Sequence, residues 1–249
     1  MEKDNLTKNF LKFFKLLNLN LLFSKLIAHI HFLDPKENTK QRVISAVILI
    51  PIALYAIFYS KDFFIFLAII ISIIMASEWT EMIVKMKDQR KWQIIGLLYI
   101  AIPIFMVIKI RFYGSEVLFW MFAVIWSTDI FAFFAGKNLG GPKLAPQISP
   151  NKTWSGLFGG VIASAVIGFL SSFMFSGGVI FFILTSIFLA IIEQLSDLLE
   201  SKFKRIFGVK DSGNIIPGHG GVLDRLDGMM LVAPVLFALI TFFPNKFIS

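Results

Sequence analysis

The sequence predicts an all-α, polytopic integral membrane protein, with about seven to nine transmembrane helices for a chain of this length. Of its 249 residues, 57% are hydrophobic and only 16% are charged, whereas ordinary soluble domains carry roughly 25% charged residues. The mean hydropathy is +0.77. The apolar residues also gather in runs close to the ~20 residues that cross a bilayer as a helix. We therefore expect a single transmembrane domain over 40–249 and no separate soluble domain.

Seven apolar runs are expected to form the membrane spans. In chain order they are 43–59, 63–84, 94–108, 116–136, 156–174, 179–199 and 229–244. Several are shorter than ~20 residues, so we expect tilted helices or an additional re-entrant break.

The basic residues orient these spans. If residue 42 is cytoplasmic, the segments on its side of the membrane hold 20 of the 24 Lys and Arg residues. The positive-inside rule favours this orientation. It places both long polar loops, 137–155 and 201–228, in the cytoplasm, and long loops in a compact bundle usually carry function.

The first 39 residues are expected to be an N-terminal extension that forms an amphipathic interfacial helix. Its apolar runs are broken too often for a span, and its polar side chains fall on one helical face. Such a helix suits the surface of an anionic bilayer. The alternative is an extension without ordered structure, and in either case His29 and His31 are expected to be solvated.

Composition also limits the chemistry. The chain has no cysteine, which excludes disulfides, iron–sulfur clusters, thiolate zinc sites and cysteine nucleophiles. Any metal must therefore be held by oxygen ligands. The net charge of +8 does not indicate nucleic acid, because the basic residues lie between apolar segments. It indicates a membrane surface and an anionic substrate.

Acidic residues within or beside the predicted spans are the clearest functional signal. An ionised carboxylate costs about 2.5–3.5 kcal/mol at the centre of a bilayer, so it needs a partner. Asp129 lies inside a predicted span, while Glu193 and Asp197 are four residues apart and share a helix face. Asp224 and Asp227 are three residues apart and lead into the last span. A structural ion pair is the alternative explanation, strongest for Glu193.

Carboxylates beside cations favour phosphoryl or nucleotidyl transfer. Mg²⁺ prefers carboxylate oxygens and is completed by substrate phosphates, and cations offset the charge of those phosphates. Asp197, Asp224 and Asp227 are candidates for such a metal site. The cations that face them in loop 201–228 are Lys202, Lys204, Arg205, Lys210 and Arg225.

The same loop carries a long pattern of fixed positions. It reads Ser201, Lys204-Arg205, Lys210-Asp211, Gly213, Pro217, His219-Gly220-Gly221 and Asp224-Arg225-Leu226-Asp227. In this form it resembles the signature of the CDP-diacylglycerol synthase family, also called phosphatidate cytidylyltransferases. The stretches KQRVISAVILIPIALY and WSTDIFAFFAGKNLGGPKLAPQISPNKTWSG resemble other parts of that family, so the resemblance runs from about residue 40 to the C-terminus. One departure is Ser155, where the family often has Glu.

The resemblance implies that CTP and phosphatidate react to give CDP-diacylglycerol and pyrophosphate. It implies dependence on Mg²⁺, with a second cation often part of the site. It also implies a multi-pass protein of the cell (inner) membrane whose active site lies on the cytoplasmic side. The expected partners are CTP, phosphatidate and the lipid bilayer, without nucleic acid; a homodimer is compatible with the sequence.

On this interpretation, a phosphatidate oxygen attacks the α-phosphorus of CTP in line. The expected metal ligands are Asp197 and Asp224 first, then Asp227 and Glu193. The expected catalytic residues are Asp224, Asp227, Lys204, Arg205, Lys210, Asp211, His219 and Arg225. The expected substrate-binding residues are Asp129, Ser149, Asn151, Lys152, Ser201, Gly220 and Gly221. His219 would be a phosphate donor, an acid or simply a hydrogen-bonding residue, and Asp211 would orient Lys210.

Two other functions compete with this hypothesis. A CTP-dependent lipid kinase of similar architecture would transfer the γ-phosphoryl group instead. An ion-coupled transporter would use the acidic span residues as ion sites, but the polar residues gather at one face rather than at the midplane, and no inverted repeat is visible.

Overall fold

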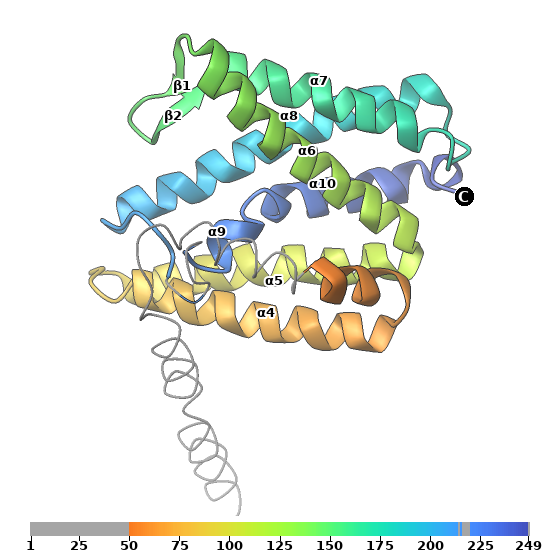
Figure 1. The fold of residues 1–249 in the computed structure, drawn as a ribbon. Helices are drawn as coiled ribbons and strands as arrows, with labels where there is room; N and C mark the ends of the chain where they lie inside the picture. Colours follow the sequence, from red (N-terminus) through yellow and green to blue (C-terminus); the bar gives the residue numbers. More distant parts are fainter. Residues whose placement is uncertain (1–49, 214, 216–219, 249) are drawn as a thin grey trace, which may run out of the picture.

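Long apolar helices make up about three quarters of the computed structural model, which describes residues 50–213, 215 and 220–248 (Figure 1). Six of the described helices are long and apolar enough to cross a membrane. They are α4 (Lys61–Met82), α5 (Gln89–Tyr113), α6 (Ser115–Leu139), α7 (Trp154–Ser171), α8 (Val179–Ile206) and the segment Leu223–Phe242, made of α9 (Leu223–Leu226) and α10 (Met229–Phe242). A short 3-10 helix, η1 (Pro244–Lys246), follows.

The predicted fold class is confirmed. The six helices correspond to the last six expected spans, and residues 50–58 are helical within the first expected span, 43–59. The rest of that span and the predicted interfacial helix lie outside the described residues.

Local signals in the sequence set the helix ends. α4 begins at Ser60, whose hydroxyl accepts the N–H of Phe63 at 3.2 Å, and α7 begins at Thr153, whose hydroxyl accepts the N–H of Gly156 at 3.1 Å. Such caps satisfy donors that the first turn leaves unpaired. α6 ends at Gly140, with φ of +62°, and Gly178, with φ of +80°, precedes α8. Glycine tolerates these conformations at little cost.

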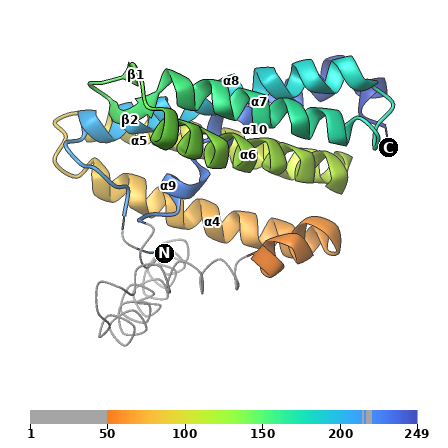
Figure 2. The same ribbon diagram turned by 45° about the horizontal axis from the view of Figure 1, so that its top comes forward.

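The helices run in alternating directions, so the connections gather at two ends of the bundle (Figures 1 and 2). One end holds the α4–α5 turn, the C-terminal end of α8 and a small hairpin. In this hairpin β1 (Lys143–Ala145) pairs antiparallel with β2 (Ser149–Thr153), with Lys143 opposite Thr153. The other end holds the α5–α6 turn, the α7–α8 turn and the C-terminus. The first of these ends is the one that the basic residues assign to the cytoplasm.

α6 and α7 pack closely through small residues. A Cβ added at Gly156 would lie 2.8 Å from the carbonyl oxygen of Ala132, and one at Gly160 would lie 2.9 Å from Thr128. Close backbone approach through glycine is typical of helix pairs in membranes. It positions the hairpin, which joins these two helices, against the end of the bundle.

α8 is longer than predicted. The expected span ended at residue 199, but the helix continues to Ile206. An ion pair of 2.7 Å between Glu200 and Lys204, one turn apart, lies in this extension, and Phe203 packs its ring edge-on against Trp79 of α4. Ser201, Lys204 and Arg205 are therefore helical rather than part of a loop, and they share one helix with Glu193 and Asp197.

Candidate active site

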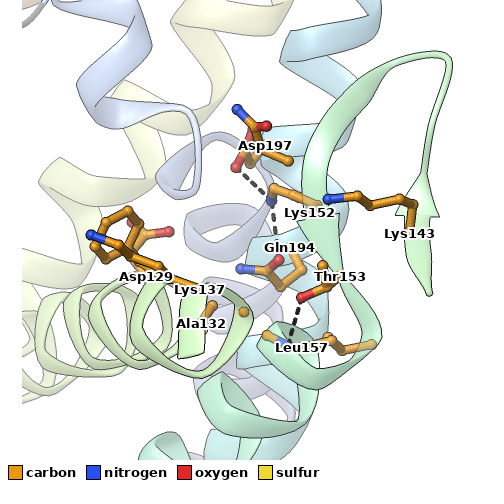
Figure 3. Close-up of a pocket in the computed structure, with 13 residues that line it drawn as sticks. Asp129, Ala132, Lys137, Lys143, Lys152, Thr153, Leu157, Gln194 and Asp197 are labelled. Atoms are coloured by element: carbon orange, nitrogen blue, oxygen red, sulfur yellow. Dashed lines mark hydrogen bonds and ion pairs between the residues drawn. The ribbon is translucent and has the colours of Figure 1, made fainter. Parts of the chain in front are cut away.

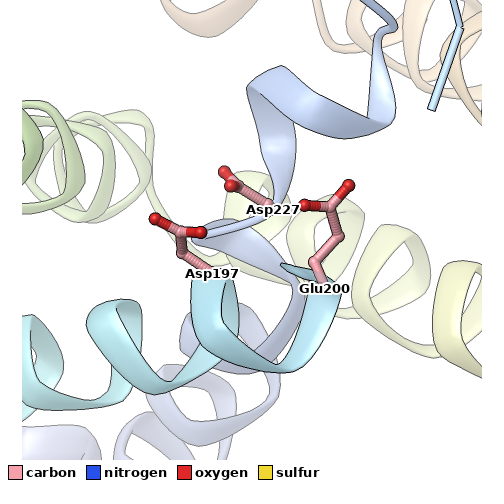
Figure 4. Close-up of side chains that lie close together, drawn as sticks. All are labelled: Asp197, Glu200 and Asp227. Carbon is pink, nitrogen blue, oxygen red and sulfur yellow. The ribbon is translucent and has the colours of Figure 1, made fainter. Parts of the chain in front are cut away.

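Three carboxyl groups gather near the C-terminal end of α8 (Figure 4). Asp197 and Glu200 lie one turn apart on that helix, and Asp227 lies in the turn between α9 and α10. Each offers one oxygen, and these oxygens lie within 4.8 Å of one another. Glu200 is buried, and its Oε1 atom has no hydrogen-bond partner among the described residues. A buried carboxylate oxygen without a donor, beside two further carboxylates, fits a hard divalent cation such as Mg²⁺.

Ser196 holds this carboxylate cluster (Asp197, Glu200 and Asp227) together. Its hydroxyl donates to the backbone carbonyl oxygen of Asp227 and accepts the N–H of Leu231, the third residue of α10, at 3.1 Å. Ser196 is fully buried on α8. One side chain therefore fixes the turn that carries Asp227 against the helix that carries the other two acids.

Asp197 also contacts the hairpin (Figure 3). Its Oδ2 atom lies 2.5 Å from the Nζ atom of Lys152, and its Oδ1 atom accepts the hydroxyl of Ser201 at 3.2 Å. Lys152 donates as well to Oε1 of Gln194 at 3.0 Å. The Lys152 ammonium group thus links β2 to α8 and neutralises part of the acidic charge.

A pocket of about 490 Å³ opens beside these contacts, between α6, α7, β2 and α8 (Figure 3). Its lining includes the predicted Asp129, Asn151 and Lys152, and it also includes Lys137 and Lys143, which the sequence analysis did not single out. The remaining lining residues are Ala132, Phe133, Gly136, Thr153, Gly156, Leu157, Gln194 and Asp197. Asp197 therefore belongs both to the carboxylate cluster and to a pocket with three lysines.

Asp224, the other first-choice metal ligand, lies beside the carboxylate cluster and contacts Lys204, which was expected to face it. Its Oδ1 atom accepts from the Lys204 ammonium group at 2.7 Å, and its Oδ2 atom accepts the N–H groups of Ser212 and Gly221, both at 2.9 Å. Lys204 also pairs with Glu200 at 2.7 Å. Within the described part of the chain, Asp224 is thus occupied by protein donors beside the cluster rather than included in it.

Glu193 lies one turn before Asp197 and is fully buried. Its Oε2 atom accepts from Nε2 of Gln194 at 2.9 Å, and its Oε1 atom is buried without a hydrogen-bond partner among the described residues. Asp129 lines the pocket, whereas Glu193 is buried beside the pocket residue Gln194 and belongs neither to the pocket lining nor to the carboxylate cluster.

The other predicted residues lie around the site. Arg205 donates to the backbone carbonyl oxygens of Ile148 at 3.2 Å and Val209 at 3.0 Å, which ties the hairpin to the segment after α8. Lys210, Asp211 and Arg225 are exposed, and Ser149 starts β2. Gly220 has φ of +85°, and the N–H of Gly221 is used by Asp224. His219 lies outside the described residues.

Ser155, the departure from the family pattern, has a local role. Its hydroxyl donates to the carbonyl oxygen of Gly140 and lies 3.0 Å from the hydroxyl of Thr153. It connects the first turn of α7 to the end of α6, next to the pocket residues Thr153 and Gly156. An anionic residue at this position would face that carbonyl oxygen without a proton to donate.

Comparison with known proteins gives a consistent picture. The sequence profile described as the cytidylyltransferase family matches residues 85–243. The chain is 44% identical over 215 residues to a phosphatidate cytidylyltransferase of Rickettsia bellii, covering 81% of this chain and 90% of that protein. It is 42% identical over 218 residues to the Rickettsia felis protein of the same name, covering 83% and 94%. It is 42% identical over 170 residues to that of Brucella abortus, covering 67% and 60%. The profile match spans the carboxylate cluster and the whole pocket.

Proposed function

The chain belongs to the cytidylyltransferase family, and from this premise we propose that it transfers the cytidylyl group of CTP to phosphatidate, giving CDP-diacylglycerol and pyrophosphate. The protein is an enzyme, a nucleotidyltransferase of phospholipid synthesis. The observation that carries the proposal is the position of Asp197, which joins the carboxylate cluster to the pocket lined by Lys137, Lys143 and Lys152. At Asp197, the acids proposed to bind the metal lie next to the lysines proposed to bind the substrate phosphates.

Asp197, Glu200 and Asp227 are the residues that would hold Mg²⁺. Bound there, the ion would supply positive charge to the phosphate oxygens of the substrate. The unpaired Oε1 atom of Glu200 supports this role, because a buried carboxylate oxygen without a donor is costly unless something else binds it.

The reaction needs little proton transfer. The phosphate of phosphatidate is a monoester, and such groups lose their second proton near pH ~6, so it is largely a dianion at neutral pH. One of its oxygens forms a bond to the α-phosphorus of CTP, while the bond from that phosphorus to the β-phosphate oxygen breaks and pyrophosphate leaves with the electron pair. The chain must mainly hold two polyanions in line and offset their repulsion.

Three lysines are placed for that task. Lys137, at the end of α6, and Lys143 and Lys152, on the hairpin, all line the pocket. Lys152 already lies between Asp197 and Gln194, so it can exchange an acidic partner for a phosphate without moving far. Lys204 remains with Glu200 and Asp224, where it holds one proposed metal ligand and the acid beside it.

We place the active site at the cytoplasmic face of the cell membrane. The positive-inside rule supports this orientation, since 20 of the 24 Lys and Arg residues lie in segments assigned to that side. The α4–α5 turn, the hairpin and the end of α8 lie together at that end of the bundle (Figure 1). A phosphatidate head group in the inner leaflet would lie at the same level as the pocket.

Labelled CTP tests the reaction directly. Purified protein in detergent micelles with phosphatidate and Mg²⁺ should move the label of α-³²P-CTP into lipid and that of γ-³²P-CTP into pyrophosphate. Leaving out CTP, phosphatidate or Mg²⁺ should each stop the reaction. Transfer of the γ-label to lipid, with release of CDP, would instead identify a lipid kinase and overturn the proposal.

A further inference from the structure

Glu78 is a buried acid that the sequence analysis did not single out. It lies in the second half of α4, and its residue exposure is 1%. A carboxylate buried in a membrane helix is costly, and such residues usually have a function and a specific partner. α4 contributes no residue to the carboxylate cluster or to the pocket lined by Lys152. The partners of Glu78 therefore indicate what it does.

The partners of Glu78 are Ser212 and the two residues that directly precede Asp224, Val222 and Leu223. Oε2 of Glu78 accepts the hydroxyl of Ser212 at 3.1 Å and the N–H of Leu223 at 2.9 Å. Oε1 accepts the N–H of Val222 at 2.8 Å. Val222 and Leu223 start α9, where backbone N–H groups have no acceptor within the helix. Glu78 supplies the acceptors that α9 itself cannot provide.

Asp224 binds the same two segments from the other side. Its Oδ2 atom accepts the N–H groups of Ser212 and Gly221, while Ser212 gives its hydroxyl to Glu78. The backbone lies close to Glu78 here, since a Cβ at Gly221 would lie 2.7 Å from Oε2 and one at Gly213 would lie 3.1 Å from Oε1. Two carboxylates thus hold Ser212 and the start of α9 between them.

We infer that Glu78 is a positioning residue for the metal site. Leu223, which it binds, directly precedes Asp224, and Asp227 follows one turn later. By fixing Val222 and Leu223, Glu78 sets where the carboxyl groups of Asp224 and Asp227 stand relative to α8. This inference rests on the proposed function in one respect, namely that the carboxylate cluster binds a divalent ion. The hydrogen bonds of Glu78 do not depend on the proposed function.

Packing of α4 does not require this carboxylate. The neighbouring Trp79 lies with its ring centre 5.2 Å from that of Phe203 and 5.3 Å from that of Phe207, both near the end of α8. These aromatic contacts hold α4 against α8 independently of Glu78. Loss of the Glu78 charge should therefore disturb the metal site more than the fold.

The substitution Glu78→Gln tests the inference. The carboxamide has the same size, but its NH₂ group replaces one acceptor and faces backbone or hydroxyl donors, so at least one hydrogen bond is lost. Changes to groups that orient metal ligands typically cost about 10- to 100-fold in metal affinity or activity. We expect a rise of that order in the Mg²⁺ concentration for half-maximal pyrophosphate release. The Kd for Mn²⁺, followed by electron paramagnetic resonance without substrates, should rise by a similar factor.

Glu81→Gln is the matched control, because Glu81 is an exposed acid one turn further along α4. It should leave both values unchanged. A folded Glu78→Gln protein with wild-type Mg²⁺ dependence and Mn²⁺ affinity would overturn the inference. So would a lower yield of active protein with unchanged metal dependence, since that result would mean a purely structural role.

A second variant keeps the test decisive if Glu78→Gln does not fold. Ser212→Ala removes one of the three donors to Glu78 and keeps the N–H that binds Asp224. Because this hydroxyl donates to a carboxylate, its loss should raise both metal values by about 10-fold. If neither metal value rose in Ser212→Ala, that result would contradict the inference. A wild-type protein that releases no pyrophosphate would instead contradict the proposed function, and the Mn²⁺ titration would still test Glu78.

Discussion

Asp197 is the residue at which the two halves of the site meet. It shares the carboxylate cluster with Glu200 and Asp227 and lines the pocket with Lys152. On each side of the cluster a lysine offsets the acids: Lys152 pairs with Asp197 at 2.5 Å, and Lys204 pairs with Glu200 at 2.7 Å. Close pairing of opposite charges allows several acids to stand near one another at the edge of a bilayer.

Asp224→Asn should lower kcat/KM for pyrophosphate release by roughly 100-fold or more, because a positioning error of about 1 Å can cost that much. The amide would keep an acceptor for Lys204, but its NH₂ group would face the N–H groups of Ser212 and Gly221. Asp62→Asn, at an exposed acid in the first turn of α4, is the control and should retain full activity. Wild-type activity in Asp224→Asn would refute the role given to these contacts.

The sequence predicted part of this site from single residues. Asp129, Glu193, Asp197 and Asp227 were found because acids in apolar spans need partners. Glu78 satisfies the same criterion, since it lies well inside the expected span 63–84, so the signal was present and overlooked. Its partners could not be predicted, because they lie 134–145 residues away and are one hydroxyl and two backbone N–H groups. Helical periodicity carries no information about such contacts.

Among the elements, α8 organises the site. Its 28 residues correspond to about 42 Å at 1.5 Å per residue, which exceeds the ~30 Å hydrocarbon core. The last turns, which carry Glu200, Ser201 and Lys204, can therefore reach the head-group region. Glu200 was not among the predicted ligands, because hydropathy falls at residue 199 and the expected span was ended there. Had the helix been continued, its three-residue spacing from Asp197 would have placed both acids on one face.

The hairpin is the element that the sequence did not predict. Its strands have only three and five residues, and β2 reads SPNKT, which has neither an alternating apolar pattern nor β-branched enrichment. The region was predicted to be a polar loop that carries function, but the pairing that places Lys143 opposite Thr153 comes from tertiary structure. This pairing brings Lys143 to the pocket that Lys152 also lines.

At the scale of the whole molecule, the hydropathy pattern predicted the helices well because each span must satisfy its backbone within itself. The charge pattern then predicts which end is cytoplasmic. The site lies at the end with the α4–α5 turn, away from the C-terminus (Figure 2). This orientation can be tested without reference to activity.

The absence of cysteine allows single cysteines to report the orientation. Lys87→Cys lies in the α4–α5 turn and Lys246→Cys in η1, and both positions are exposed. In intact spheroplasts, a membrane-impermeant maleimide should label Lys246→Cys and should label Lys87→Cys only after lysis. The reverse pattern would place the site outside the cell and contradict the proposed topology.

Asp197, Glu200 and Asp227 are proposed to hold the divalent ion used in cytidylyl transfer. The most direct test is the Mg²⁺ dependence of pyrophosphate release by Glu200→Gln, with Glu81→Gln as the control. Because Glu200 is a proposed ligand rather than a support, we expect kcat/KM to fall by about 100-fold or more and the half-saturating Mg²⁺ concentration to rise. A folded Glu200→Gln enzyme with wild-type activity and wild-type Mg²⁺ dependence would contradict the assignment.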